Sequence, residues 1–561
     1  MLVPKLVTTL KGYTRGQFVA DATAGAIVGI VALPLAIAFA IGSGVSPQAG
    51  LYTAIIAGFL ISVLGGSKVQ IGGPTGAFVV IVYGIVQKYG IEGLTIATMM
   101  AGVILVVMGV ARLGGAIKFI PQPVVTGFTS GIAVIIASGQ VRDFFGLQMA
   151  RVPAEFVQRI EALASSIGTV ALAPVAIALL TVLIVVYWPR VTARVPSPAV
   201  ALVVTTLAAQ WLHLPVETIG SRFGAIDASF PALHFPSVTL HVLRELVAPA
   251  FTIAMLGGIE SLLSAVVADG MIGSRHRSNM ELVAQGVANI VTPMFGGMPA
   301  TGAIARTATN IRSGGRTPVA GIVHALTLLV ITLFFGRWAS LIPVATLAGI
   351  LMVVSYHMSE WRTFRSTLNA PRSDIAVLLV TFGLTVLVDL TVALGVGMVL
   401  ASFLFMRKMA EVTQVNAVTE LFAEDGDDQG DEPRPQIPNG VVVYEIDGPF
   451  FFGAAATFKE TLGTLAAPPK VLILGMTKVD LLDATGLSLI KDLAHKGFTG
   501  GTRLVLYGVH AQPHRVIEHA GLLAELGDDN CVETIEEALA RAEIYAQRKT
   551  PVSSTAQGTG R

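Results

Sequence analysis

Charge is scarce in this chain. Lys, Arg, Asp and Glu make up 13% of its 561 residues, whereas 53% are hydrophobic and the mean hydropathy is +0.72. Soluble domains carry roughly 25% charged residues. A soluble globule of this size could not bury so much apolar surface, so most of the chain is predicted to lie in a membrane. The formal net charge of +1 argues against a nucleic-acid-binding surface.

Cysteine is almost absent. Cys531 is the only one, which excludes an internal disulfide framework and a thiolate cluster for a metal. The ten histidines are scattered, mostly in predicted loops, and do not form the cluster with carboxylates that a membrane enzyme needs. The start of the chain has no short apolar segment with a cleavage site, so no removable signal peptide is expected. We therefore expect no cofactor, no bound metal and no enzymatic activity.

Long apolar runs fill the chain up to about residue 410. Most are near the length that crosses ~30 Å of hydrocarbon, and two are about half as long. Counting both kinds gives fourteen elements, seven before residue 230 and seven after it. The full-length runs lie at about 22–42, 49–64, 92–112, 122–140, 170–188, 197–212, 247–267, 281–295, 317–335, 341–356, 373–388 and 390–406, and the half-length runs at 76–87 and 300–311.

Lys and Arg orient this predicted transmembrane domain, which covers residues 1–410 and holds repeats at about 15–215 and 245–408. With the N-terminus in the cytoplasm, most loops rich in Lys and Arg fall inside, and the uncharged loop 42–48 falls outside. The segment 141–169 contains arginines and falls outside, which is a mild violation. An even number of elements returns the chain to the cytoplasm. Both termini are therefore predicted to be cytoplasmic, in a multi-pass protein of the cell (inner) membrane.

The character of the chain changes after residue 410. Residues 411–439 contain the acidic run EDGDDQGDE and are predicted to form a solvated linker. In residues 440–548, three apolar segments alternate with helical patterns, which predicts a small α/β domain. The polar tail 549–561 is expected to be disordered. The predicted strands are VVVYEI at 441–446, VLILG at 471–475 and RLVLYG at 503–508.

Two stretches interrupt the apolar pattern in the same way. IGGPTGAF at 71–78 and FGGMPATGAI at 295–304 each contain Gly-Gly, a proline and then Thr-Gly-Ala. Irregular backbone at membrane depth is tolerated only inside protein or beside a watery cavity. Matched interruptions in matched halves are typical of inverted-repeat transporters, in which two half-helix N-termini bind an anion near the bilayer midplane. The simpler interpretation is that Gly and Pro only kink or closely pack the helices, but the matched pair favours a binding site.

Two charged residues lie near these breaks. Arg306 follows the second break and either helps to bind an anion or pairs with a carboxylate. Glu260 lies in an otherwise apolar span and shares a helix face with Ser264, four residues further on. A buried glutamate can carry a coupled proton or help to hold a cation such as sodium. The alternative is a salt bridge between Glu260 and Arg306 that only holds the site together.

Several segments are similar to one known family when taken together. They are GLYTAIIAGFLISVLGGS (50–67), GGPTGAF (72–78), GFTSGIAVIIASGQVRDFFGL (127–147), GGIESLLSAVVADGM (257–271), SRHRSNMELVAQGVANI (274–290), FGGMPATGAIART (295–307) and DATG (483–486). Over nearly its whole length the chain resembles the SulP anion transporters, the sulfate-permease family.

The resemblance implies a fold of two inverted seven-span repeats, with half-helices 3 and 10 and a core domain that moves against a gate domain. It also implies that the α/β domain is a cytoplasmic STAS domain, a candidate site for a protein partner, and that the protein is a homodimer in the lipid bilayer. The implied anion site combines one aromatic residue of the first span with the residues of both breaks. These are Phe39, Thr75, Gly76, Ala77, Phe78, Thr301, Gly302, Ala303, Ile304, Ala305 and Arg306.

The resemblance also bears on coupling and substrate. Glu260 and Ser264 fall where bacterial bicarbonate members use an Asp and a Thr to bind sodium, and Glu in place of Asp favours a proton. LPLA at 33–36 replaces the Leu-Pro-Gln-Gly of many members and, with HMSEWR at 357–362, is most similar to the bacterial dicarboxylic acid branch. We predict proton-coupled uptake of C4-dicarboxylates (succinate, fumarate, aspartate) by alternating access. The alternative is a sulfate transporter, a sodium-coupled bicarbonate transporter or an anion exchanger of the same family.

Other interpretations stay open for two features. Thr485 matches the position that is phosphorylated in soluble anti-sigma antagonists, which makes it a candidate regulatory phosphosite. The alternative explanation of the motif is structural: a strand-to-helix turn needs Asp483 to cap the helix and Gly486 to form the turn. For the membrane domain, a channel should have a continuous polar lining, which these spans lack, whereas a motor role as in prestin is compatible with the sequence.

Overall fold

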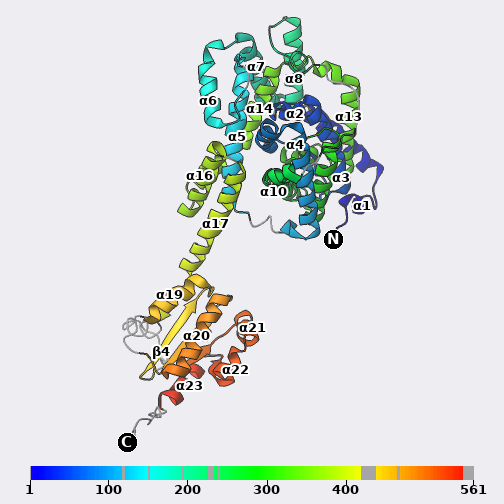
Figure 1. Cartoon of the computed structure of the whole chain (residues 1–561). Helices are drawn as coiled ribbons and strands as arrows, with labels where there is room; N and C mark the ends of the chain where they lie inside the picture. The colour runs from blue at the N-terminus through cyan, green and yellow to red at the C-terminus, as the bar shows by residue number, and fades with distance from the viewer. Residues whose placement is uncertain are drawn as a thin grey trace. The chain divides into compact units, whose positions relative to one another are not determined.

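The computed structural model describes residues 2–115, 120–149, 152–192, 195–224, 233–237, 240–388, 390–417, 437–463 and 468–547. These residues form two compact units, Met1–Ala401 and Ser402–Arg561, coloured blue to yellow-green and yellow to red in Figure 1. The predicted tail 549–561 and most of the predicted acidic linker lie outside the described residues.

The first unit is helical, and its helices coincide with the apolar runs of the sequence. Seven of its described helices are long and apolar enough to cross a membrane. The helices of the first half that match the predicted runs are α2 (Arg15–Gly42), α3 (Pro47–Leu64), α4 (Gly76–Val110), α5 (Gln122–Phe145), α7 (Leu172–Val191) and α8 (Ser197–Trp211). Those of the second half are α10 (Leu240–Ile272), α11 (Ser278–Met294), α12 (Ile304–Arg312), α13 (Val319–Ala339), α14 (Val344–Met358), α16 (Arg372–Leu387) and α17 (Leu390–Val412). Short helices connect them at α1 (Lys5–Thr9), α6 (Phe156–Ser165), α9 (Ile219–Phe223) and α15 (Trp361–Thr367).

Helix α4 contains two of the predicted elements. Gly90 interrupts its helical backbone with φ 70° and ψ −172°, a conformation that glycine adopts without a steric penalty. The predicted runs 76–87 and 92–112 lie on either side of this kink. With α4 counted as two elements, the described helices that match the predicted runs number seven in each half of the chain.

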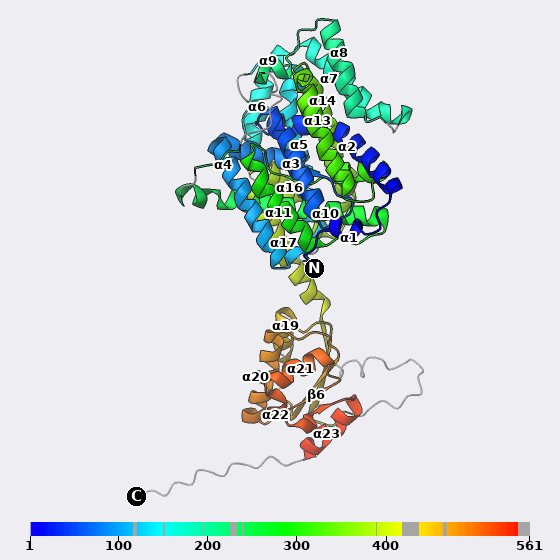
Figure 2. The same cartoon turned by 90° about the vertical axis from the view of Figure 1, so that its right-hand side faces the viewer.

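The helices of the first unit pack in two groups that each mix both halves of the chain. In the core group, α4 packs against α10 and α11, α3 against α11 and α13, and α2 against α13. In the gate group, α5 packs against α14 and α16, and α7 against α8 and α14. Figure 2 shows α3, α4, α10 and α11 of the core group side by side. This exchange of helices between the two halves is the arrangement that an inverted repeat predicts.

Two glycines let α4 and α11 cross with their backbones in contact. A Cβ atom on Gly102 would lie 2.6 Å from the carbonyl oxygen of Gly286, and a Cβ on Gly286 would lie 2.6 Å from the carbonyl oxygen of Gly102. Membrane helices associate through close packing at such small residues, because lipid tails remove the hydrophobic driving force between them.

The second unit is a five-stranded sheet in the order β3-β4-β5-β6-β7, with β4 to β7 parallel and β3 antiparallel to β4. Buried side chains cover both faces of the sheet: Phe450, Phe458 and Ile490 belong to one core, and Val443 and Ala538 belong to the other. The strands are β3 (Gln414–Ala417), β4 (Val441–Asp447), β5 (Val471–Lys478), β6 (Arg503–Tyr507) and β7 (Cys531–Val532). The helices are α19 (Phe452–Gly463), α20 (Ala484–Gly500), α21 (Ala511–His519), α22 (Leu522–Leu526) and α23 (Ile535–Gln547).

One boundary differs from the sequence prediction. Gln414–Ala417 falls within the predicted linker 411–439, but it forms strand β3 and pairs with the end of β4. Four residues are too few to show a strand period in the sequence. The strand forms because the edge of β4, which is distant in sequence, pairs with it. The sequence pattern does not reveal that pairing.

The glycine crossing can be tested by Gly286→Ala. We expect this variant to unfold at a lower temperature than the parent in detergent, because its Cβ would overlap the backbone of α4. Overpacking of this kind costs about 1–3 kcal/mol. The matched control is Gly84→Ala on α4, where a Cβ meets no atom within 4 Å. Alanine also has the better helix propensity there, so an equal loss in both variants would contradict the crossing.

Candidate functional site

The two sequence breaks meet in space. They form a short antiparallel ribbon of β1 (Gly72–Gly73) and β2 (Thr301–Gly302), in which Gly72 pairs with Gly302 and Gly73 with Thr301. The ribbon continues where the N–H of Ala303 donates to the carbonyl oxygen of Ile71 at 2.9 Å. Helices α4 and α12 start directly after the two strands. Both half-helix N-termini therefore lie beside one backbone ribbon, as the matched breaks predict.

These N-termini are not capped by their own side chains. Thr75 is the N-cap of α4 and Ala303 is the N-cap of α12, and neither side chain accepts a hydrogen bond from its helix. The first turn of a helix has N–H groups without intrahelical partners and the positive end of the helix dipole. Two such ends close together favour an anion with oxygen acceptors.

Helix α10 presents Glu260 and Ser264 to different half-helices. The hydroxyl of Thr75 donates a hydrogen bond to Oε2 of Glu260 at 2.9 Å. The hydroxyl of Ser264 donates to Oγ1 of Thr307 on α12, at 3.4 Å. The four-residue spacing places both side chains on one face of α10. This face contacts both half-helices, so Glu260 and Ser264 lie beside the two breaks, and their role in coupling stays a prediction.

Arg306 lies between the two breaks and is 2% exposed. It donates a hydrogen bond through Nη2 to the carbonyl oxygen of Pro74, while Nη1 is buried and has no hydrogen-bond partner among the described residues. A Cβ on Gly73 would lie 2.5 Å from Nη1, so only glycine leaves room for the guanidinium. In the described part of the chain Arg306 and Glu260 form no ion pair. The predicted alternative of a direct salt bridge is therefore not formed in this structure.

The remaining predicted residues divide between contact with the site and packing behind it. Phe39 of α2 reaches the first residue of α4, because a Cβ on Gly76 would lie 3.3 Å from its Cε1. Phe78 is fully buried and packs on α10, 3.4 Å from where a Cβ of Gly257 would lie. Ile304 is 38% exposed. Gly76, Ala77, Thr301, Gly302 and Ala303 are buried, whereas Ala305 is exposed.

A buried polar network that the sequence analysis missed lies beside the first break. Its hub is Glu281 on α11, which is fully buried. Glu281, Gln285 and Asn289 are spaced by four residues, and this polar stripe along an apolar helix was the available signal. The carboxylate of Glu281 accepts hydrogen bonds from Gly66 N at 2.8 Å, Ser67 N at 3.1 Å, Gln285 Nε2 at 2.9 Å and Ser261 Oγ at 3.3 Å, and Gln70 Nε2 donates to Ser261 Oγ at 2.8 Å.

Hydrogen bonds from three helices hold the second break. The Asn289 amide donates to the carbonyl oxygen of Ala300 at 2.8 Å and accepts from its N–H at 2.9 Å. The hydroxyl of Thr53 on α3 accepts from the N–H of Met298 at 2.7 Å. The hydroxyl of Thr301 donates to the carbonyl oxygen of Gly257, on α10, at 2.8 Å. Three helices thus fix the backbone that precedes α12.

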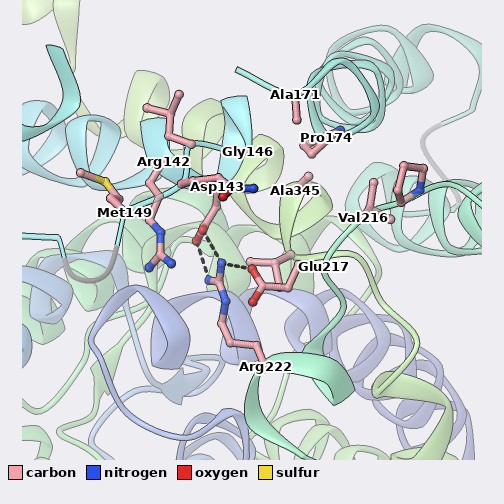
Figure 3. Close-up of a pocket in the computed structure, with 14 residues that line it drawn as sticks. Arg142, Asp143, Gly146, Met149, Ala171, Pro174, Val216, Glu217, Arg222 and Ala345 are labelled. Atoms are coloured by element: carbon pink, nitrogen blue, oxygen red, sulfur yellow. Dashed lines mark hydrogen bonds and ion pairs between the residues drawn. The ribbon is translucent and has the colours of Figure 1, made fainter. Parts of the chain in front are cut away.

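A cavity of about 620 Å³ lies elsewhere in the gate group, between the ends of α5, α7 and α14. Figure 3 shows the guanidinium of Arg222 between the carboxylates of Asp143 and Glu217. Both Asp143 oxygens accept from Arg222, at 2.7 and 3.0 Å. The N–H of Val344 donates to the carbonyl oxygen of Glu217 at 2.9 Å. None of the predicted site residues lines this cavity. Its ion pairs join Arg222 of α9 to Asp143 of α5 and to Glu217.

The DATG turn of the second unit has a structural explanation. Oδ1 of Asp483 accepts from the N–H of Gly486 at 2.8 Å, and Oδ2 accepts from the N–H of Phe452 at 3.2 Å. A Cβ on Gly486 would lie 2.5 Å from the carbonyl oxygen of Phe450. The predicted capping by Asp483 is confirmed. Thr485 is exposed in the first turn of α20, and its phosphorylation stays a prediction.

Comparisons with known proteins agree with this architecture. A model described as Sulfate permease family matches residues 18–381, and a STAS domain model matches residues 432–538. YvdB of Bacillus subtilis, provisionally named a sulfate transporter, is 41% identical over 92% of this chain and 96% of its own length. The bicarbonate transporter BicA of Picosynechococcus is 30% identical over 93% of this chain and 94% of its own length.

Solved structures are similar over most of the chain. The SLC26A9 structure aligns with a TM-score of 0.85 and 17% identity, covering 97% of this chain and 93% of that one. The transmembrane domain of a cyanobacterial BicA aligns with a TM-score of 0.62 and 34% identity, covering 68% of this chain and 98% of that domain. The first likeness shows that the fold is shared over nearly the whole chain, and the STAS domain model identifies the C-terminal domain.

The Glu281 network can be tested by Glu281→Gln. The variant replaces one acceptor oxygen with an NH2 donor that faces other donors, so at least one buried group loses its partner. An unpaired buried polar group costs about 1–3 kcal/mol, and we expect a lower unfolding midpoint in detergent. Glu92→Gln, at an exposed position of α4, is the matched control. Equal midpoints for the two variants would mean that the network adds nothing to stability.

Proposed function

The chain belongs to the sulfate permease family, and from that premise we propose that it is a secondary active transporter that takes up C4-dicarboxylates together with protons. The observation that supports this most is the antiparallel pairing of the two breaks, Gly72 with Gly302 and Gly73 with Thr301. It brings two uncapped half-helix N-termini to one place inside a helical membrane unit. An oxyanion bound there would accept hydrogen bonds from the free backbone N–H groups.

The substrate is proposed from sequence and chemistry together. Succinate, fumarate and aspartate each carry carboxylates that fit two positive helix ends. LPLA at 33–36 and HMSEWR at 357–362 resemble the dicarboxylate branch of the family. Sulfate and bicarbonate are the second candidates, because YvdB and BicA are named for those anions. Backbone N–H donors accept any of these oxyanions, so the donor set alone does not choose among them.

The proposed coupling residue is Glu260. Its Oε2 accepts from the hydroxyl of Thr75, the residue that precedes the first N–H groups of α4. A proton on Glu260 would remove a negative charge close to the place where the anion binds. Proton and anion would therefore favour each other's binding, as symport requires. Sodium held near Glu260 and Ser264 is the alternative coupling ion.

The cellular setting is part of the proposal. We infer a multi-pass protein of the cell (inner) membrane with both termini in the cytoplasm, from the Lys and Arg distribution. The protein would be a homodimer, and the second unit would bind a cytoplasmic protein near the exposed Thr485. Core and gate groups would move against each other for alternating access, with the anion carried between them.

Uptake by purified protein in liposomes tests the function directly. Labelled fumarate, succinate, sulfate and bicarbonate would be offered under an imposed proton gradient and, separately, an imposed sodium gradient. We expect accumulation of the dicarboxylates that follows the proton gradient and rises as external pH falls. Preference for sulfate or bicarbonate would make that anion the substrate in place of the dicarboxylates. Failure to transport any of the four anions would refute the proposed function.

Arg306→Ala should largely abolish anion transport while leaving a folded membrane protein. The guanidinium supports the carbonyl of Pro74 and adds positive charge beside both half-helices. Arg312→Ala, at an exposed position in the last turn of the same helix, is the control and should transport like the parent. Folding would be checked by size-exclusion chromatography in detergent. Parent-like uptake and affinity in Arg306→Ala would remove Arg306 from the site.

Glu260→Gln should lose gradient-driven accumulation and keep anion binding, with some exchange retained. Glutamine has the size of the protonated acid but cannot release a proton. Glu245→Gln, at an exposed position of the same helix, is the matched control. Accumulation equal to the parent under a proton gradient would make Glu260 a structural residue. Uptake driven by sodium alone in the parent would favour a sodium site.

A further inference from the structure

One side chain of the gate group lies directly against the first residue of a half-helix. A Cβ on Gly76 would lie 2.6 Å from Sδ of Met358 and 3.4 Å from its Cε. The same Cβ would lie 3.3 Å from Cε1 of Phe39. Gly76 is the first residue of α4. The space in front of this N-terminus is therefore bordered by Phe39 from α2 and by Met358 from α14.

The end of α14 is held in place by the gate group itself. The carbonyl oxygen of Ser359, the residue after Met358, accepts a hydrogen bond from the hydroxyl of Ser130 on α5, at 2.6 Å. The helix stops here, and Glu360 adopts a left-handed backbone with φ 42°, which is uncommon for a residue with a side chain. The position of the Met358 thioether next to α4 thus follows from the packing of α14 on α5.

We propose that Met358 forms the gate-side wall of the anion site and sets the size of the anion that the site admits. This inference rests on the proposed function, because it assigns the space before Gly76 to the anion. An anion that reaches the N–H groups at the start of α4 must contact Phe39 and Met358 or displace them. The thioether is flexible and polarizable, so it can adapt to the anion without competing for the backbone donors.

A wall of this kind has a measurable consequence for selectivity. Shortening Met358 to alanine enlarges the site on one side only, and the backbone N–H donors stay as they are. The KM for large anions should therefore fall relative to the KM for small anions. A difference of one methylene group in a pocket changes discrimination by about 10–200-fold. A residue that only packs two helices together would instead change uptake of all anions by the same factor.

The first experiment compares Met358→Ala with Met352→Ala in proteoliposomes. Met352 also lies on α14 but packs within the gate group, which makes it the matched control. We expect the ratio of KM for fumarate to KM for bicarbonate to fall about tenfold in Met358→Ala and to stay at the parent value in Met352→Ala. Met358→Leu, which keeps the volume, should also keep the parent ratio. An unchanged ratio in Met358→Ala overturns the proposal.

The second experiment tests proximity without transport. Cys531 is the only cysteine, so Cys531→Ser gives a background in which Met358→Cys and Met352→Cys each carry one thiol. The transported anion should slow maleimide labelling of Met358→Cys severalfold and leave Met352→Cys unaffected. If the parent transports an anion that does not protect Met358→Cys, the inference alone fails. If the parent transports none of the anions, the proposed function fails and the inference fails with it.

Discussion

The need to pair backbone N–H and C=O groups inside a membrane governs the first unit of this protein. Two irregular segments are buried among helices, and every polar group in such a segment needs a partner from the protein. The β1–β2 ribbon supplies some of these partners. Side chains supply others: Asn310 donates to the carbonyl of Val69, Thr307 accepts from the N–H of Ile71, and Asn289 bonds both polar groups of Ala300. The surrounding helices are arranged to bring these side chains to the ribbon.

The same pairing creates the candidate site. It satisfies backbone groups of the two strands but provides no partner for the N–H groups in the first turns of α4 and α12. The strands are satisfied by each other and by side chains, whereas Thr75 and Ala303 give no cap to the helices they precede. Positive charge is then added by Arg306, which is buried against the carbonyl of Pro74. Glu260 accepts a hydrogen bond from the hydroxyl of Thr75, the N-cap of α4. The candidate anion site is thus the place where backbone N–H groups are left without intrahelical partners.

The sequence predicted what depends on local pattern. Apolar runs predicted the helices, and the repeated Gly-Gly, Pro and Thr-Gly-Ala motif predicted the two breaks. Both features depend only on residues that are close together in the sequence. Glu260 and Ser264 could be paired because they lie on one helix. The distant partners of Glu281, strand β3 and the contact between Met358 and Gly76 could not be predicted. Each joins segments far apart in the chain, and one sequence without spatial information does not show which segments meet.

The proposed site is also divided between the two helix groups in a way that suits alternating access. The core group supplies the polar contacts described around the breaks: the ribbon, both half-helix N-termini, Arg306, and the stripe on α10. The gate group contributes the apolar side chain of Met358, next to the backbone that the bond between Ser130 and Ser359 holds. If the core moves against the gate, the donors travel with the anion and only an apolar contact must break. Breaking an apolar contact leaves no polar group unpaired, so the movement avoids the largest cost of rearrangement at membrane depth.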